Sequence, residues 1–256
     1  MMLLLNTRPT QRAATLSQRL NRAGIEVVEL PLLELTGLPY SAELAALYAQ
    51  LADTQVIVVV SPTAVDVGMQ YLQVSQIEMS SLAHIQWIAV GQATAQRLKD
   101  YGISASIPDV ETSEGMLALP VLQNLAVKQV AFWRGRGGRQ FMMDALQQRG
   151  VKVQNFVLYQ RQCPEQAHIQ FEQFQSRFRH QHQSVWVCIS SEASWLNWLK
   201  LCQNSPDILS QCQYLTLGTR LTTLVRQQQM PLVTHQLDDL DPEQICHFLI
   251  QHKGSA

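Results

Sequence analysis

The chain has 256 residues, of which 46% are hydrophobic and 15% charged, and its formal net charge is −1 at pH 7. This length accommodates two domains of about 120 residues, each large enough to bury a core. A net charge so close to zero produces no general field to attract nucleic acid or an anionic membrane, so we expect neither as a partner.

The apolar N-terminus predicts a buried strand rather than a targeting segment. Residues 1–5 are apolar, but the run stops at Asn6 and has no basic flank before it. It is too short for a signal peptide or a membrane span.

The five cysteines form no CxxC pair, and their odd number argues against a disulfide framework. We therefore expect a cytoplasmic protein.

Six short apolar runs, each bounded by turn or cap signals, predict strands that are buried on both faces, as in a parallel sheet. The runs are 3–5, 56–60, 85–90, 130–133, 185–189 and 214–217. A stretch with helical character follows each of them. This alternation predicts an open α/β sheet, in which crossovers are right-handed and ligands bind at the carboxyl ends of the strands.

Cap signals mark where the helices begin and end. The first helix is expected over 12–23, with Gly24 as a left-handed C-terminal cap. Ser61 supplies a cap hydroxyl directly after the second strand. A glycine-rich turn after the fourth strand leads into an expected helix over 139–149, which Gly150 closes.

The segment 167–183 is rich in Gln, His and Phe and predicts a polar surface helix with one apolar stripe. It contains His168, His180 and His182, but no pair of histidines has a ligand spacing supported by carboxylates. A solvated helix face explains these histidines better than a metal site does, so we expect no metal.

Two extended apolar stretches that end before prolines, 30–35 and 157–161, interrupt the alternation. If the opening strand and helix pack with the last hundred residues, these stretches lie side by side as a two-stranded connector. The expected domains are then a discontinuous one, 1–35 plus 164–256, and an inserted one, 39–157, with crossings near 36–38 and 158–163.

The chain also contains a loose internal repeat. Residues 20–24 match 146–150, 61–64 match 190–193, and 91–94 match 218–221, at offsets of 126, 129 and 127 residues. A period this long indicates a duplicated half-protein, because solenoid repeats span only about 20 to 50 residues. Two such halves usually face each other across a cleft where small ligands bind. The alternative is a coincidence between unrelated helix ends.

Seven landmarks resemble, in order and spacing, those of the uroporphyrinogen-III synthase family. They are Thr7-Arg8-Pro9, Leu30-Pro31-Leu32, Ser61-Pro62-x-Ala64-Val65, Ala89-Val90-Gly91-x-Ala93-Thr94-Ala95, Thr112-Ser113-Glu114-Gly115, Arg134-Gly135-x-Gly137-Gly138-Arg139 and Tyr159-x-Arg161. The last hundred residues match less well. The serine motif there reads Ser190-Ser191-Glu192-Ala193, and Gly218-Thr219 lacks a threonine three residues after the glycine.

The resemblance implies a monomeric, cofactor-free enzyme of tetrapyrrole and haem synthesis. Its fold would be two flavodoxin-like α/β domains with parallel sheets, joined by a two-stranded β-ladder into a bilobal molecule with an interdomain cleft. Such an enzyme closes linear hydroxymethylbilane into uroporphyrinogen III, with loss of water and inversion of the last pyrrole ring through a spiro intermediate. Without it the bilane cyclises to the uninverted isomer. A transient contact with the enzyme that makes the bilane is also expected.

The implied substrate carries eight carboxylates, yet the chain has no large basic surplus to hold them. Helix N-termini offer another way to bind anions, because their first N–H groups are unpaired and the macrodipole is positive there. The candidate substrate-binding residues at or beside expected helix starts are Ser61, Gly91, Thr94, Ser113, Gly138, Ser190, Gly218 and Thr219. The alternative for each hydroxyl is that it only caps its helix.

Three arginines are further candidates for binding the substrate. Arg134 and Arg139 flank the glycine-rich turn, and a guanidinium pairs with a carboxylate bidentately. The alternative for both is a solvated turn. Arg8 follows the first strand in the equivalent place, and its alternative is a packing role.

Tyr159 is the catalytic residue that the resemblance implies. A phenol stays protonated at neutral pH and can donate a proton to a departing hydroxyl. General acid catalysis of this kind contributes about 10² to 10⁴ in rate. The alternative is an aromatic side chain that packs in a connector strand.

Two other functions compete with this interpretation. Duplicated α/β halves also form clamshells, so the main alternative is a non-catalytic binding or sensor protein for an anionic small molecule. A nucleotide-dependent enzyme that uses the 134–139 turn is the weaker alternative. That turn lacks the lysine and hydroxyl of a P-loop and the spacing of a dinucleotide fingerprint.

Overall fold

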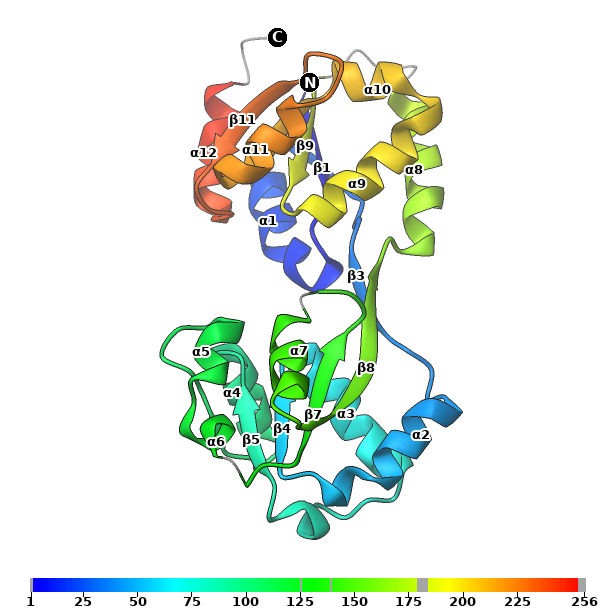
Figure 1. Cartoon of the computed structure of the whole chain (residues 1–256). Coiled ribbons are helices and arrows are strands. Elements are labelled where there is room, and N and C mark those ends of the chain that lie inside the picture. The colour runs from blue at the N-terminus through cyan, green and yellow to red at the C-terminus, as the bar shows by residue number, and fades with distance from the viewer. Residues whose placement is uncertain (1, 125, 139, 179–183, 253–256) are drawn as a thin grey trace. The chain divides into compact units, whose positions relative to one another are not determined.

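The computed structural model describes residues 2–124, 126–138, 140–178 and 184–252. It divides into two compact units, Met1–Glu34 with Gln162–Ala256, and Leu35–Arg161 (Figure 1). The expected inserted domain, 39–157, lies inside the second unit, and the chain passes between the units within β3 (Glu34–Gly37) and at the end of β8 (Lys152–Gln162). The two-stranded ladder and the interdomain cleft stay predictions.

The first unit contains a five-stranded sheet in the order β11-β10-β9-β1-β2, and every strand pair in it is parallel. Its strands are β1 (Met2–Asn6), β2 (Glu26–Glu29), β9 (Ser184–Ile189), β10 (Gln213–Leu217) and β11 (Val233–Leu237). Its helices are α1 (Thr10–Arg22), α8 (Glu165–Phe178), α9 (Glu192–Leu201), α10 (Pro206–Gln211), α11 (Gly218–Arg226) and α12 (Pro242–Gln251), with a 3₁₀ turn at Cys202–Asn204. Alternate residues of β1 belong to different cores, because helices cover both faces of this sheet.

The second unit contains a six-stranded sheet in the order β3-β8-β7-β4-β5-β6, in which the pairs from β8 to β6 are parallel. The strands not yet introduced are β4 (Val56–Val59), β5 (Gln86–Ala89), β6 (Ala105–Ser106) and β7 (Gln129–Gly135). The helices are α2 (Ala42–Ala49), α3 (Pro62–Val74), α4 (Gln92–Asp100), α5 (Ser113–Leu117), α6 (Pro120–Gln123) and α7 (Phe141–Gln148), with 3₁₀ turns at Leu51–Asp53 and Met79–Leu82.

Each face of this sheet has its own core. Side chains of α2, α3 and α4 pack with Ile57, Val59 and Trp133 on one face. Side chains of α5, α6 and α7 pack with Val58 and Phe132 on the other. All four residues of β4 are fully buried, which confirms the prediction of strands covered on both sides.

All six predicted strands are present, and the edge strands β2, β6 and β11 were not predicted; β6 has only two residues. β2 reads Glu-Val-Val-Glu, and β11 begins at an exposed valine and contains Thr, His and Gln. Edge strands are only partly buried, so neither carries the continuous apolar run that marks a central strand. β8 is also longer than the expected connector and spans eleven residues.

The helix endings agree with the sequence signals. Gly24 and Gly150 have φ of +70° and +78°, and their N–H groups bond to the carbonyls of Asn21 and Gln147. The first pair of matched segments is therefore one type of helix ending used in both units. The expected surface helix is α8, and residues 179–183 of the expected range lie outside the described residues.

Within the described residues no helix combines the length and the apolar character needed to cross a membrane.

Gly68 in α3 packs directly on the ring of Trp133, and a Cβ there would lie 2.1–2.2 Å from two ring atoms. Trp133 is fully buried and stacks edge-on against Trp87, so its ring has no room to retreat. A glycine-to-alanine change inside a helix ordinarily gains up to about 1 kcal/mol. We expect Gly68→Ala instead to lower the free energy of unfolding by about 1–3 kcal/mol, as overpacking does.

Urea unfolding checks this expectation, with Gln70→Ala, an exposed position of the same helix, as the control. The control should stay within about 0.5 kcal/mol of the wild type. A Gly68→Ala variant as stable as the wild type would contradict the contact.

Candidate functional site

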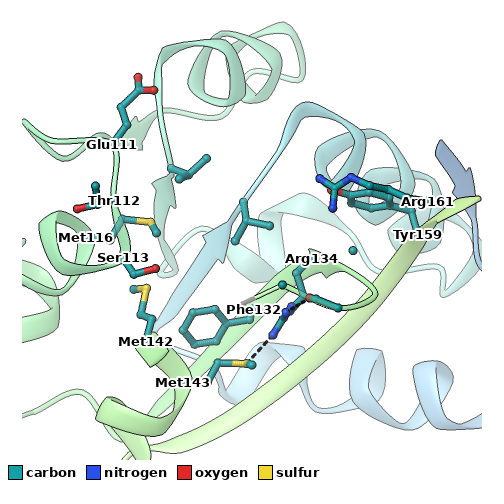
Figure 2. A pocket seen from close by; sticks show the side chains of 15 residues that line it. Glu111, Thr112, Ser113, Met116, Phe132, Arg134, Met142, Met143, Tyr159 and Arg161 are labelled. Carbon is teal, nitrogen blue, oxygen red and sulfur yellow. Dashed lines mark hydrogen bonds between the residues drawn. The ribbon is translucent and has the colours of Figure 1, made fainter. Parts of the chain in front are cut away.

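The carboxyl ends of β4, β5 and β7 surround a cavity of about 340 Å³ in the second unit (Figure 2). We call it the strand-end cavity. The side chains that line it include Glu111, Ser113, Met116, Phe132, Arg134, Met142, Met143 and Tyr159. A parallel sheet exposes its loops and helix N-termini at this edge, which is where the α/β pattern predicts ligand binding.

A β-bulge and a glycine position Tyr159 at the cavity. The register between β7 and β8 shifts after Arg134, which pairs with Val157, so that Gly135 pairs with Tyr159. A bulge of this kind re-aims the side chain that follows it. The tyrosine ring then lies against Gly135, where a Cβ would be 2.6 Å from the ring. Only 2% of Tyr159 is exposed, and it still lines the cavity.

Ser61 connects Tyr159 to the N-terminus of α3. Its Oγ accepts the N–H of Ala64 at 3.1 Å, as an N-cap does, and its hydroxyl donates to the Tyr159 Oη at 2.9 Å. The phenol oxygen thus accepts a hydrogen bond and keeps its own proton to donate. Hydrogen bonds in such a chain polarise one another, and the positive end of the helix dipole lies at its start.

Arg134 is a buried cation without an acidic partner. It lies within β7 and is 7% exposed, so the solvated-turn alternative is wrong for this residue. Its guanidinium donates to the carbonyl of Gly137 and contacts the Met143 Sδ at 3.7 Å. Burial lowers the pKa of this guanidinium. No carboxylate pairs with it in the part of the chain that the structure describes.

The glycine-rich turn after Arg134 differs from its prediction. Gly137 and Gly138 are exposed and left-handed, with φ of +78° and +80°. The helix that follows begins at Phe141 rather than 139, so Gly138 lines the cavity from a turn and not from a helix start. Arg139 lies outside the described residues.

A carboxylate of the chain itself covers the N-terminus of α4. Gly91 is the N-cap of this helix, and the Glu111 Oε1 accepts the N–H of Gln92 at 2.9 Å. A Cβ on Gly91 would lie 2.3–2.4 Å from the Glu111 carboxyl atoms, so glycine is required for this close approach. The anion-binding position that was predicted at Gly91 is therefore already filled.

The structure places Thr94 and Ser113 differently from the expected positions at helix starts. Thr94 is 2% exposed inside α4 and does not line the cavity. The cap of α5 is Thr112, whose Oγ1 accepts the N–H of Gly115 at 3.1 Å. Ser113 is the first residue of that helix and does line the cavity.

The first unit carries the remaining candidates. The serine that caps α9 is Ser191 and not the predicted Ser190, because Ser191 and Ser194 form a capping box. Gly218 is left-handed, with φ of +71°, whereas Gly91 is extended, so this matched pair differs in backbone conformation. Thr219 is exposed in the first turn of α11. Arg8 is half-buried, and its backbone N–H donates to the Asn6 Oδ1 at 3.3 Å.

Comparison with known proteins identifies the family of this chain. A family model described as "Uroporphyrinogen-III synthase HemD" matches residues 14–236. The chain belongs to the uroporphyrinogen-III synthase family.

Two curated relatives in this family illustrate the degree of similarity. The uroporphyrinogen-III synthase of Escherichia coli K12 is 29% identical over 231 residues, which is 88% of this chain and 91% of that one. The uroporphyrinogen-III synthase of Proteus mirabilis is 32% identical over 162 residues, which is 62% of this chain and 80% of that one.

Two solved structures of uroporphyrinogen III synthases share the fold. A mutant protein from Thermus thermophilus superimposes with a TM-score of 0.64 at 12% identity and covers 99% of both chains. The uroporphyrinogen-III synthetase of Helicobacter pylori 26695 gives a TM-score of 0.57 at 12% identity and covers 98% of both chains. These matches confirm an α/β fold with parallel sheets.

Among the residues that line the cavity, sequence reasoning did not select Met116, Met142, Met143 or Phe132. Each is at most 6% exposed and follows helical or strand periodicity, so its pattern is that of an ordinary core residue. Glu111 was also missed, since it lies in an exposed loop with no local signal that it reaches α4.

No group of three or more His, Cys, Asp or Glu side chains in the described ranges is placed to hold a metal ion.

The contact between Gly91 and Glu111 predicts a non-additive pair of variants. Gly91→Ala must displace the Glu111 carboxylate, and Glu111→Ala removes it, so each should lower the free energy of unfolding by about 1 kcal/mol, as loss of a cap does. The double variant should lose no more than about either single variant, because both changes break one contact. Denaturant unfolding of the four proteins measures this, and two losses that simply add would show that the residues act independently.

Proposed function

We propose that this member of the uroporphyrinogen-III synthase family cyclises hydroxymethylbilane to uroporphyrinogen III, with loss of water and inversion of the terminal pyrrole ring. The family match over residues 14–236 carries this conclusion. The strand-end cavity supports it, because it combines a polarised phenol with a buried cation that has no carboxylate partner among the described residues. The substrate supplies both a departing hydroxyl and carboxylates.

In the proposed mechanism, Tyr159 is the general acid. Its proton goes to the hydroxyl of the hydroxymethyl group, the carbon–oxygen bond breaks, and water leaves. The Ser61 hydroxyl holds the phenol oxygen at 2.9 Å and stabilises the negative charge that develops on it. When the terminal ring has attacked and the ring system closes, the proton that it releases returns to the phenolate. No cofactor enters this sequence of proton transfers.

The proposed binding residues fall into two groups. In the second unit, Arg134 pairs with a substrate carboxylate, while Ser113 and Gly138 line the same cavity and offer hydrogen-bond donors. In the first unit, the helix starts near Ser190, Gly218 and Thr219, together with Arg8, are proposed to contact other carboxylates. Gly91 and Thr94 have structural roles in α4 and are not proposed as ligands.

We also propose that the protein acts in the cytoplasm as a monomer. All five cysteines are free, as is typical of a reducing compartment. The monomeric state and the transient contact with the enzyme that makes the bilane rest on the resemblance alone.

The activity is tested by generating hydroxymethylbilane in situ, adding the protein without cofactors, and separating the type I and type III uroporphyrins after oxidation. We expect the type III isomer to dominate, since only catalysed closure inverts the ring. If folded protein gives only the type I isomer, the alternative of a binding or sensor protein takes first place.

The same assay tests Tyr159. Tyr159→Phe keeps the ring against Gly135 but removes the proton, so kcat should fall by about 10² to 10⁴. Ser61→Ala leaves the phenol in place and should cause a smaller loss of kcat. Circular dichroism and thermal unfolding control for folding. Full activity in a folded Tyr159→Phe protein would exclude the residue as the general acid.

A further inference from the structure

One end of the strand-end cavity contains three methionines and a phenylalanine. Met116 comes from α5, Met142 and Met143 from α7, and Phe132 from β7. Figure 2 shows these four side chains on one side of Arg134, together with Glu111, Thr112 and Ser113, and it shows Tyr159 and Arg161 on the other side. Each of the four is between 3% and 6% exposed. The cavity thus has one end where methionine and phenylalanine side chains adjoin the polar side chains of Glu111, Thr112 and Ser113, and another end with the Tyr159 phenol, with the Arg134 cation between them.

Arg134 limits what this cavity can bind. A guanidinium has five N–H donors, and those of Arg134 contact one carbonyl oxygen and, weakly, one thioether sulfur. A buried charge is ordinarily paired, because leaving it unpaired in an apolar surrounding is costly. The ligand should therefore carry a carboxylate beside an apolar or aromatic body.

The volume limits the ligand further. At about 340 Å³ the cavity lies near the lower end of the range for small-molecule sites, about 300–1,000 Å³. The whole bilane has four pyrrole rings and eight carboxylates. This cavity alone accommodates one ring with its acidic side chains, and a neighbouring cavity of about 580 Å³ shares Arg134, Gly135 and Gly137 with it.

We propose that the strand-end cavity holds a single terminal pyrrole ring of the bilane, with the methionines and Phe132 against the ring and Arg134 on one of its carboxylates. This inference rests on the proposed function and adds which part of the substrate the cavity takes. The ring is a terminal one because Tyr159, at the other end of the cavity, must reach the reacting hydroxyl, and only the two terminal rings react.

Methionine suits this task for a physical reason. Its thioether is polarisable and makes favourable contacts with aromatic rings, and its unbranched side chain adapts to different shapes. One of the two terminal rings must turn over during the reaction. A wall of methionines keeps contact with a ring in more than one orientation, because three rotatable bonds let each side chain adapt more than a branched one does.

The first experiment replaces the paired methionines by Met142→Leu and Met143→Leu together. Leucine keeps the volume, so the protein should fold. Loss of two sulfur–ring contacts should raise KM by about threefold to tenfold, and the share of the type I isomer should rise. The matched control is Met69→Leu, because Met69 is 7% exposed in the core of the same unit and does not line the cavity. It should behave as the wild type.

The second experiment measures binding without turnover. The probe is porphobilinogen, a monopyrrole with one acetate and one propionate group, titrated by calorimetry into the wild type, the double methionine variant and Arg134→Gln. We expect both variants to bind it at least threefold more weakly than the wild type. Val90→Phe, which enlarges a side chain that lines the cavity, should also weaken binding and shift the product toward type I.

The outcomes separate this inference from the proposed function. A wild type that makes no type III isomer yet binds the monopyrrole through Met142 and Met143 would overturn the function and support the cavity assignment. A wild type that makes the type III isomer, with KM, isomer ratio and monopyrrole binding all unchanged in the double methionine variant, would overturn the cavity assignment and leave the function standing.

Discussion

Burial of the parallel sheets on both faces is the constraint on which the rest of the structure depends. The four residues of β4 are fully buried, and β7 is buried along its whole length. A polar side chain in the middle of such a strand would lose its contact with water and rarely find a partner. Chemistry is therefore confined to strand ends, and this explains why Ser61, Arg134 and Tyr159 all occur where a strand ends or its register shifts.

Close approach at glycine is the second device that shapes the site. The ring of Tyr159 packs against Gly135, the carboxylate of Glu111 against Gly91, and the ring of Trp133 against Gly68. None of these three has a positive φ, so the missing Cβ matters here and not the backbone freedom. A side chain that lies against a glycine backbone is held by shape, which restricts its rotamer without further hydrogen bonds. For Tyr159 this restriction holds the ring, while the phenol oxygen accepts a hydrogen bond from Ser61.

The sequence predicts the central strands well because each is a continuous apolar run, and it predicts helix endings well because Gly24 and Gly150 have one conformational role. It fails where two neighbours offer the same chemistry. Ser190 and Ser191, or Thr112 and Ser113, are equally good caps by type, and only the register of the preceding turn selects one. Partners that meet through tertiary structure, such as Glu111 and Gln92, have no local signal.

The sequence does not identify the cavity methionines, and the reason is different. A buried methionine at helical spacing predicts a core position, and Met142 and Met143 are core residues by burial. Whether such a residue also faces a cavity depends on whether side chains from other elements fill the space next to it. Arg134 was recognised as a cation from its motif, yet its placement inside β7 follows from the length of that strand, which runs two residues past the apolar run.

Electrostatics links the low net charge of the chain to the proposed substrate. Two unit charges 4 Å apart interact by about 1 kcal/mol in water and by about 4 kcal/mol at the effective dielectric constant near a protein surface. A single arginine that is 7% exposed therefore binds one carboxylate of the substrate in preference to the others more strongly than several solvated arginines would. Glu111 meanwhile fills the N-terminus of α4 with the chain's own anion, so a second substrate carboxylate is not drawn there. One strong carboxylate-binding site orients the ring that carries the carboxylate. Many equal sites would let a substrate with eight carboxylates bind in several orientations. An enzyme that must select one isomer of its product needs the first arrangement.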